Sequence, residues 1–232
     1  KDGGLSNVSS LVESKLSAGV QLPSLSNNNQ LTADAVFSLL AQPLSIVDAE
    51  KLALGFNPMV KVKLFKVGLA EADYAQAGRM ENPGFSYARV SGQAYEASLL
   101  FDIGGVILMP LKRQLESRRL QSARYQAASD VLEHIANTRR SWINAVAAKQ
   151  QTALMLKALE SAEAGNNLTR QMSALGHSNV IEAADSEMFL SGMRTTLTRQ
   201  RLAESAARES LIRQLGLWGQ QARLLKLPDR LP

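Results

Sequence analysis

The stretch of sequence that decides the fold is residues 111–175, LKRQLESRRLQSARYQAASDVLEHIANTRRSWINAVAAKQQTALMLKALESAEAGNNLTRQMSAL. It contains no proline, and Gly165 is its only glycine. Because proline and glycine break helices most strongly, the stretch predicts one helix of about 65 residues. At 1.5 Å per residue this helix would be about 95 Å long, which is too long for the inside of a compact domain.

A short break follows this stretch and predicts a reversal of the chain. Gly176 is placed to end the first helix, and either Ser178 or Asn179 can cap the start of a second one. Apolar residues then recur at helical spacing until residue 217, so the second helix is predicted over about residues 179–217. Two long helices joined by a tight turn run antiparallel, so the sequence predicts a long helical hairpin with its tip at residues 176–178.

Part of the first long helix carries an apolar stripe with an unusual period. Its members are spaced by three and then eight residues, which makes an eleven-residue repeat instead of a heptad. Such a repeat predicts straight or slightly right-handed packing of helices. The stripe consists of Leu132, Ile135, Ile143, Val146 and Leu154.

Residues 82–105 differ from the rest because β-favouring aromatic and apolar residues dominate them and Gly92 supplies a turn. In the second half, apolar residues occupy every second position from Tyr95 onward. We predict a β-hairpin whose strands, at about nine residues each, could cross a tilted bilayer; an ordinary soluble hairpin would show the same spacing. The candidate membrane-facing residues are Phe85, Tyr87, Tyr95, Leu99 and Phe101.

The remaining segments complete the predicted order of parts. Residues 1–30 are rich in serine and asparagine and are expected to form an extended arm. Residues 31–81 are expected to be helical, with Thr32 and Ser45 as N-caps and Pro58 as either a kink or a true helix start. Pro110 is expected in the first turn of the long helix, which places the helical hairpin within residues 106–219. The tail, residues 220–232, contains Pro228 and is expected to be a linker.

Composition argues against several classes of function. The net charge is +5, but acidic and basic residues are interleaved and no stacking aromatics accompany the arginines, so nucleic-acid binding is not expected. The chain has no cysteine, which excludes disulfides and thiolate sites within it. His134 and His177 lack a partner at metal-ligand spacing, and no nucleophile elbow or phosphate loop is present. We therefore expect no catalytic residues, no metal and no cofactor.

The order of these parts resembles the TolC-like outer-membrane efflux family, and the resemblance covers about residues 32–232. An Asn-Pro pair stands early in the first main helix and another stands just before the first strand, with an alanine-rich stretch between them. The strand ends in Phe-Asp-x-Gly-Gly, the tip has a glycine followed by a small polar residue, and the second helix ends in Leu-Gly. The matching segments are residues 57–58, 68–78, 82–83, 101–105, 174–182 and 215–219.

This resemblance implies a passive channel that crosses the bacterial outer membrane and the periplasm. The helical hairpin would be an element of an α-barrel tunnel and the β-hairpin part of a transmembrane β-barrel. The implied partners are other copies of the chain, a periplasmic adaptor, an inner-membrane pump and outer-membrane lipid. The implied adaptor contacts are Leu175, Gly176, His177, Ser178, Asn179, Val180 and Ile181.

The sequence departs from the family pattern in one respect. Family members usually carry two such repeats, so that three chains supply twelve strands, whereas this sequence supplies one repeat. We expect the chain to be the N-terminal half of a longer protein that forms a trimer; a one-repeat protein forming a hexamer would also close the barrel. The alternative is a soluble coiled-coil scaffold or the periplasmic adaptor itself, whose helical hairpins have a similar composition.

Overall fold

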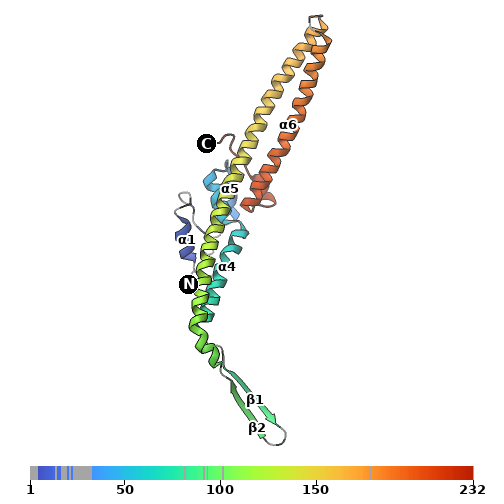
Figure 1. Cartoon of the computed structure of the whole chain (residues 1–232). Coiled ribbons are helices and arrows are strands. Elements are labelled where there is room, and N and C mark those ends of the chain that lie inside the picture. The colour runs from blue at the N-terminus through green and yellow to red at the C-terminus, as the bar shows by residue number, and fades with distance from the viewer. Residues whose placement is uncertain are drawn as a thin grey trace. The chain divides into compact units, whose positions relative to one another are not determined.

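The fold was obtained as a computed structural model that describes residues 5–13, 15–16, 20, 22, 33–80, 82–90, 92, 94–100, 102–177 and 179–231. It is mainly helical, with one very long helix and a two-stranded antiparallel sheet, as predicted. The elements are α1 (Leu5–Glu13), α2 (Ala33–Ala41), α3 (Ile46–Gly55), α4 (Pro58–Ala77), β1 (Gly84–Val90), β2 (Ala94–Leu100), α5 (Ile103–Ala174), α6 (Val180–Leu215) and α7 (Gln220–Leu224) (Figure 1).

The chain divides into two compact units. The first contains α1, almost all of α4, the β-hairpin and the beginning of α5 up to Leu132. The second contains α2, α3, α5 from Glu133 onward, α6 and α7.

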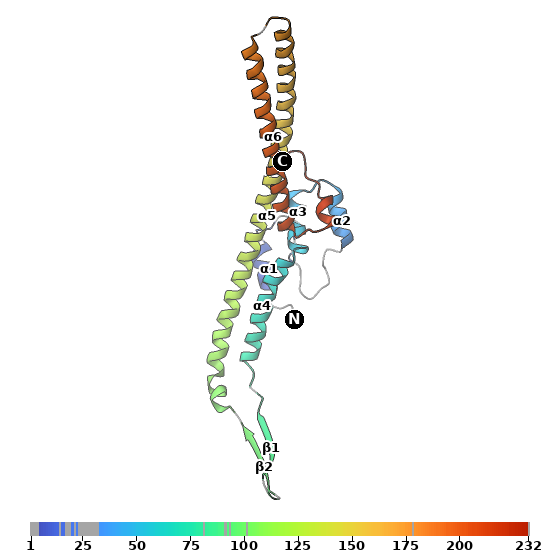
Figure 2. The same ribbon diagram turned by 90° about the vertical axis from the view of Figure 1, so that its right-hand side faces the viewer.

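In the second unit, α5 and α6 lie side by side as a helical hairpin, and the two views of the chain agree on this (Figures 1 and 2). Side-chain pairs fix the antiparallel register. Glu163 accepts a hydrogen bond from Arg194 at 3.0 Å, and Gln151 accepts one from Gln200 at 2.8 Å. The predicted reversal between two long uninterrupted helices is therefore confirmed.

The start of α5 differs from the prediction, which placed it near residue 111. The helix begins at Ile103, because the Asp102 carboxylate accepts a hydrogen bond from the backbone N–H of Gly105 at 2.8 Å and caps the first turn. Pro110 consequently lies inside the helix and not in its first turn. A proline there removes one backbone hydrogen bond, but α5 continues through it.

The core of the second unit lies where α2, α3 and α7 pack against the helical hairpin near its open end. Here α2 contacts α7 and α3 contacts α6, and Figure 2 shows α2 and α3 beside this part of the hairpin. The indole N–H of Trp142 donates to the carbonyl oxygen of Leu44 at 2.9 Å, which joins α5 to the turn before α3. Central core residues are Val36, Leu40, Leu52, Val146, Leu211 and Leu215.

The apolar stripe predicted on α5 with an eleven-residue repeat is only partly right. Ile135 and Val146 are buried, whereas Ile143 and Leu154 are exposed. The error has a simple cause: the stripe omitted a threonine, a tryptophan and an alanine that the fold buries. Counting them gives steps of three and four residues, through Ile135, Thr138, Trp142 and Ala145.

The predicted linker at residues 220–232 is wrong as well. Residues 220–224 form α7, and Leu225 and Leu227 are buried in the core of the second unit. The guanidinium of Arg208 donates to the carbonyl of Leu225 at 2.9 Å, and the backbone N–H of Leu44 donates to the carbonyl of Lys226 at 2.9 Å. This segment is therefore held by both hydrophobic burial and backbone hydrogen bonds.

The predicted extended arm at residues 1–30 is also corrected, since residues 5–13 form α1. Val8 and Val12 stand one helical turn apart and are fully buried in the first unit. The surrounding serines concealed this two-residue apolar pattern in the sequence. Most of the remaining arm and the predicted N-cap Thr32 lie outside the described residues.

Pro58 was expected either to kink a helix or to start one, and it starts one: it is the first residue of α4. A proline is well placed there because the first N–H of a helix needs no partner. Ser45 caps α3 as predicted: its side chain accepts from the N–H of Asp48 at 3.1 Å.

Candidate functional site

The β-hairpin is the first candidate surface, and its register decides which side chains share a face. Strands β1 and β2 pair so that Phe85 stands opposite Leu99, Tyr87 opposite Ala97 and Arg89 opposite Tyr95. Because side chains alternate along a strand, all six lie on one face. The rings of Tyr87 and Tyr95 stack with centroids 5.6 Å apart.

The opposite face of the hairpin carries its polar side chains, Ser86, Ser98 and Glu96, together with small and apolar residues. Ser86 and Ser98 stand directly opposite each other and share a hydrogen bond of 2.6 Å, and Ala88 stands opposite Glu96. Leu100 is an apolar residue on this face, next to the strand end. The hairpin is therefore amphipathic across its two faces.

Neither face of the hairpin is covered. Phe85 and Tyr87 are 69% and 60% exposed, and every side chain described in the two strands is exposed. Each strand has seven residues, which is shorter than the nine predicted. Of the predicted membrane-facing residues, Phe85, Tyr87, Tyr95 and Leu99 share the aromatic face; Phe101 lies outside the described residues.

The tip of the helical hairpin is the second candidate surface. Gly176 has φ +78°, a left-handed conformation that costs an L-residue with a side chain about 1 kcal/mol or more. The N–H of His177 donates to the carbonyl of Met172 at 2.9 Å, and the N–H of Gly176 donates to Ser173 at 3.1 Å. These two bonds form a Schellman motif, which satisfies the last carbonyls of α5.

The returning helix α6 starts with a capping box. Asn179, and not Ser178, is its N-cap: the Asn179 side chain accepts from the N–H of Ile181 at 3.3 Å, and Glu182 accepts from the N–H of Asn179. The apolar tip residues point into solvent, with Leu175 73% and Val180 76% exposed. The structure thus places all predicted tip residues at one end of the hairpin except Ser178, which lies outside the described residues.

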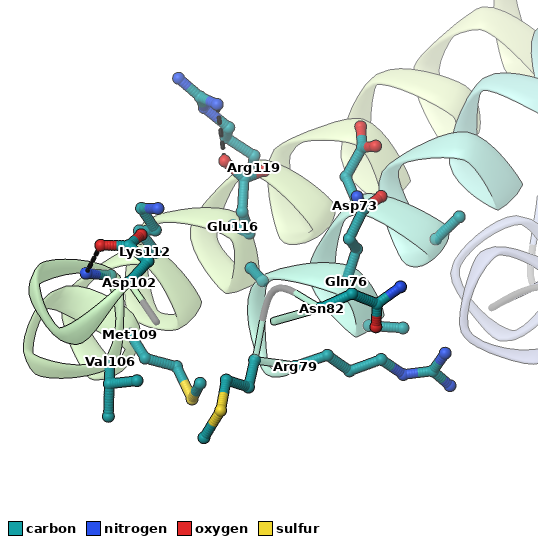
Figure 3. Close-up of a pocket in the computed structure, with 15 residues that line it drawn as sticks. Asp73, Gln76, Arg79, Asn82, Asp102, Val106, Met109, Lys112, Glu116 and Arg119 are labelled. Carbon is teal, nitrogen blue, oxygen red and sulfur yellow. Dashed lines mark hydrogen bonds and ion pairs between the residues drawn. The ribbon is translucent and has the colours of Figure 1, made fainter. Parts of the chain in front are cut away.

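A groove lies between α4 and the beginning of α5 in the first unit. It is open, measures about 1010 Å³, and receives Asp73 and Gln76 from α4 and Met109 and Glu116 from α5 (Figure 3). Two of its acidic groups have local partners: Glu116 accepts from Arg119 at 2.6 Å, and Asp102 caps α5. Acidic and basic groups of mixed sign, without a histidine or a buried nucleophile, give this groove no evident catalytic chemistry.

Two buried polar contacts in the second unit were missed by the sequence reasoning. Glu50 on α3 is fully buried and accepts a short hydrogen bond from the guanidinium of Arg139 on α5, which raises the pKa of Arg139. Asn57 donates to the carbonyl of Gln214 at 2.8 Å. The Asn57-Pro58 pair quoted above therefore joins the α3–α4 turn to the end of α6, a role that no spacing in the sequence reveals.

The described part of the chain holds no group of three histidine, aspartate or glutamate residues close enough to bind a metal ion. None of its helices is both long and apolar enough to cross a lipid bilayer.

Comparisons with known proteins support the fold. A scan against models of protein families and a search of curated proteins each found no match. Among solved structures, a crystal structure described as a membrane protein from Pseudomonas aeruginosa is similar, with a TM-score of 0.65 and 16% sequence identity. The similarity covers 86% of this chain and 48% of that one, so the chain spans about half the length of its structural neighbour. At this identity the comparison shows a shared fold: a long helical protein with a similar arrangement of elements.

Proposed function

We propose that this chain is a passive outer-membrane channel component of a tripartite efflux or export system, as its resemblance to the TolC-like family implies. In this proposal several copies assemble so that their β-hairpins form a barrel in the outer membrane. Their helical hairpins form a tunnel through the periplasm, and the tip around Leu175 to Ile181 contacts an adaptor that is coupled to an inner-membrane pump.

The observation that carries the proposal is the amphipathic, uncovered β-hairpin. A two-stranded sheet with both faces in water is marginally stable. Its aromatic face exposes Phe85, Tyr87 and Leu99, and the one charged residue on that face, Arg89, stands toward the turn beside Tyr95. A barrel strand has this pattern because one face meets lipid and the other meets an aqueous lumen. The family motifs in the sequence and the similarity to a structure described as a membrane protein support the same conclusion.

The alternative, a soluble coiled-coil scaffold or periplasmic adaptor, accounts for the long helical hairpin equally well. It gives no reason for stacked Tyr87 and Tyr95 on an uncovered sheet face. We therefore place it second.

The test compares a lysine on each face of the hairpin at neighbouring positions. Tyr87→Lys puts a charge on the aromatic face, where it would cost about 2–4 kcal/mol at the middle of a bilayer. Ala88→Lys is the matched control, because the new charge lies on the polar face directly opposite Glu96. We expect Tyr87→Lys to abolish outer-membrane insertion of the full-length protein, and Ala88→Lys to insert and to shift ion selectivity in planar bilayers.

The soluble alternative predicts a different result from the same pair. If both variants fold alike, stay in solution without detergent and never fractionate with the outer membrane, the channel proposal fails.

A further inference from the structure

The first turns of α5 carry a broad apolar surface on the side away from α4. All its members are exposed, and its isoleucines and leucines are 50–71% exposed. At about 100° per residue they occupy an arc of about 160° around the helix. Between residues 103 and 115 this arc contains one polar side chain, Gln114, and no charge. We name it the apolar face of α5: Ile103, Ile107, Leu108, Pro110, Leu111 and Leu115.

The other side of the same turns faces the groove between α4 and α5. Met109 and Glu116 line that groove (Figure 3). Helix α4 ends at Ala77, and a β-carbon at Gly78 would lie 3.6 Å from Nε of Arg113. The turns of α5 before Arg113 therefore extend past the end of α4, and their apolar face is left exposed.

The apolar character of this face ends abruptly along the helix. Over residues 116–126 the same arc of α5 is mostly polar: it carries Arg118, Gln121, Ser122, Tyr125 and Gln126. A face that packs along a neighbouring helix keeps its apolar spacing over many turns and needs only a narrow stripe. A broad apolar arc that turns polar at one level is instead the pattern of a helix that passes from lipid into water.

Basic residues gather at the level where the apolar face ends. From Lys112 to Arg119 the helix has four basic residues and one acidic residue, Glu116. Arg118 lies in the arc of the apolar face itself, so its guanidinium can reach the phosphates of lipid headgroups. Asp102, the acidic residue before these turns, lies on the groove side and caps α5. The charge on this part of α5 thus complements an anionic lipid surface.

The lengths of the strands give a second reason to expect lipid at this face. Each strand has seven residues, about 23 Å, and at a tilt of about 40° it rises about 18 Å. The apolar band of a barrel is about 25 Å tall, which leaves about 7 Å, and the headgroup region adds about 5–8 Å. The apolar face of α5 is about 18 Å long, which matches this total of about 12–15 Å to within one helical turn.

We propose that the apolar face of α5 is a lipid-binding surface that lies in the periplasmic leaflet of the outer membrane. Acyl chains contact Ile103, Ile107 and Leu111, and Arg118 binds headgroup phosphates at the boundary. The short strands and the first turns of α5 together supply the apolar height of the membrane domain. This inference rests on the proposed function and adds a membrane contact made by a helix.

The experiment attaches a nitroxide to single cysteines, which is possible because the chain has no cysteine of its own. The full-length protein carries Ile107→Cys or the matched control Tyr125→Cys, in vesicles of phosphatidylethanolamine and phosphatidylglycerol. Tyr125 is also exposed, and it points in the same direction as Ile107 but lies five turns, about 27 Å, further along α5. Collisions of the nitroxide with oxygen, which dissolves in lipid, are compared with collisions with a charged nickel chelate, which stays in water.

We expect the ratio of oxygen to nickel collisions to be at least about tenfold higher for Ile107→Cys than for Tyr125→Cys, because hydrocarbon excludes the charged chelate. Ile103→Cys and Gln121→Cys, which are also five turns apart, should repeat the result if the first variant fails to fold. Frequent nickel collisions at Ile107 and Ile103 would place the face in water, and few collisions with either reagent would show that a protein neighbour covers it. Either result, or an equal preference for oxygen at the control positions, would overturn the inference.

A label at Tyr87→Cys, on the aromatic face of the β-hairpin, separates this inference from the proposed function. Lipid contact at Tyr87 with water at Ile107 would uphold the barrel and overturn the helix contact. Lipid contact at Ile107 with water at Tyr87 would uphold the helix contact and reject the barrel. Water at both positions would reject both.

Discussion

Two glycines with the same backbone conformation but different surroundings provide the sharpest test of the fold. Gly176 and Gly216 end α5 and α6 with φ +78° and +72°, and a Schellman pair of hydrogen bonds follows each helix. A β-carbon at Gly176 would meet nothing within 4 Å. At Gly216 it would lie 2.9 Å from the α-carbon of Asn57 and 3.2 Å from its β- and γ-carbons.

The two alanine variants should therefore differ in free energy of unfolding. Gly176→Ala costs the left-handed conformation alone, about 1 kcal/mol. Gly216→Ala adds overpacking against a backbone atom that cannot rotate away, about 1–3 kcal/mol, for a total of roughly 2–4 kcal/mol. Asn57 resists displacement because its side chain is hydrogen-bonded to Gln214.

The assay is urea unfolding followed by the fluorescence of Trp142, which is buried in the core of the same unit as both glycines. Trp218 is 76% exposed and is replaced by phenylalanine in the background to remove its signal. A difference of roughly 2 kcal/mol between the variants moves the midpoint by about 1 M urea. Equal midpoints for Gly176→Ala and Gly216→Ala would refute the close packing of Asn57 against the end of α6.

Three further predictions concern the remaining contacts. Arg139→Met should destabilise the second unit by about 3 kcal/mol, because it leaves the buried carboxylate of Glu50 without its cation. In the same urea assay, Glu50→Gln with Arg139 intact should lower the free energy of unfolding by less. The ion pair with Lys149 at 2.7 Å lowers the pKa of Asp229. The stability that this ion pair contributes is therefore present above the ordinary aspartate pKa and is lost as the pH falls through the lowered value. In an NMR titration, Lys149→Gln should raise the pKa of Asp229 toward its ordinary value, and an unchanged pKa would contradict the contact. Gly176→Val should leave folding and outer-membrane insertion of the full-length protein intact while weakening adaptor docking and efflux. Crosslinking to the adaptor measures docking, and a drug or metal susceptibility assay measures efflux. Normal docking and export at normal protein levels would remove the tip from the functional surfaces.

The sequence by itself determined the features that depend on local chemistry. The absence of helix breakers in residues 111–175 predicted the long helix, Gly176 predicted its end, and the alternation from Tyr95 onward predicted a strand. These features can be predicted because backbone conformational preference and side-chain alternation act over a few neighbouring residues. The same local reasoning failed at Pro110, where the cap provided by Asp102 starts the helix earlier.

Only the tertiary structure decided which polar and small residues are buried. Glu50 meets Arg139 and Asn57 meets Gln214 across 89 and 157 residues of sequence, so no spacing rule connects them. The tail from Leu225 to Leu227 reads as a linker until the core that receives it is known.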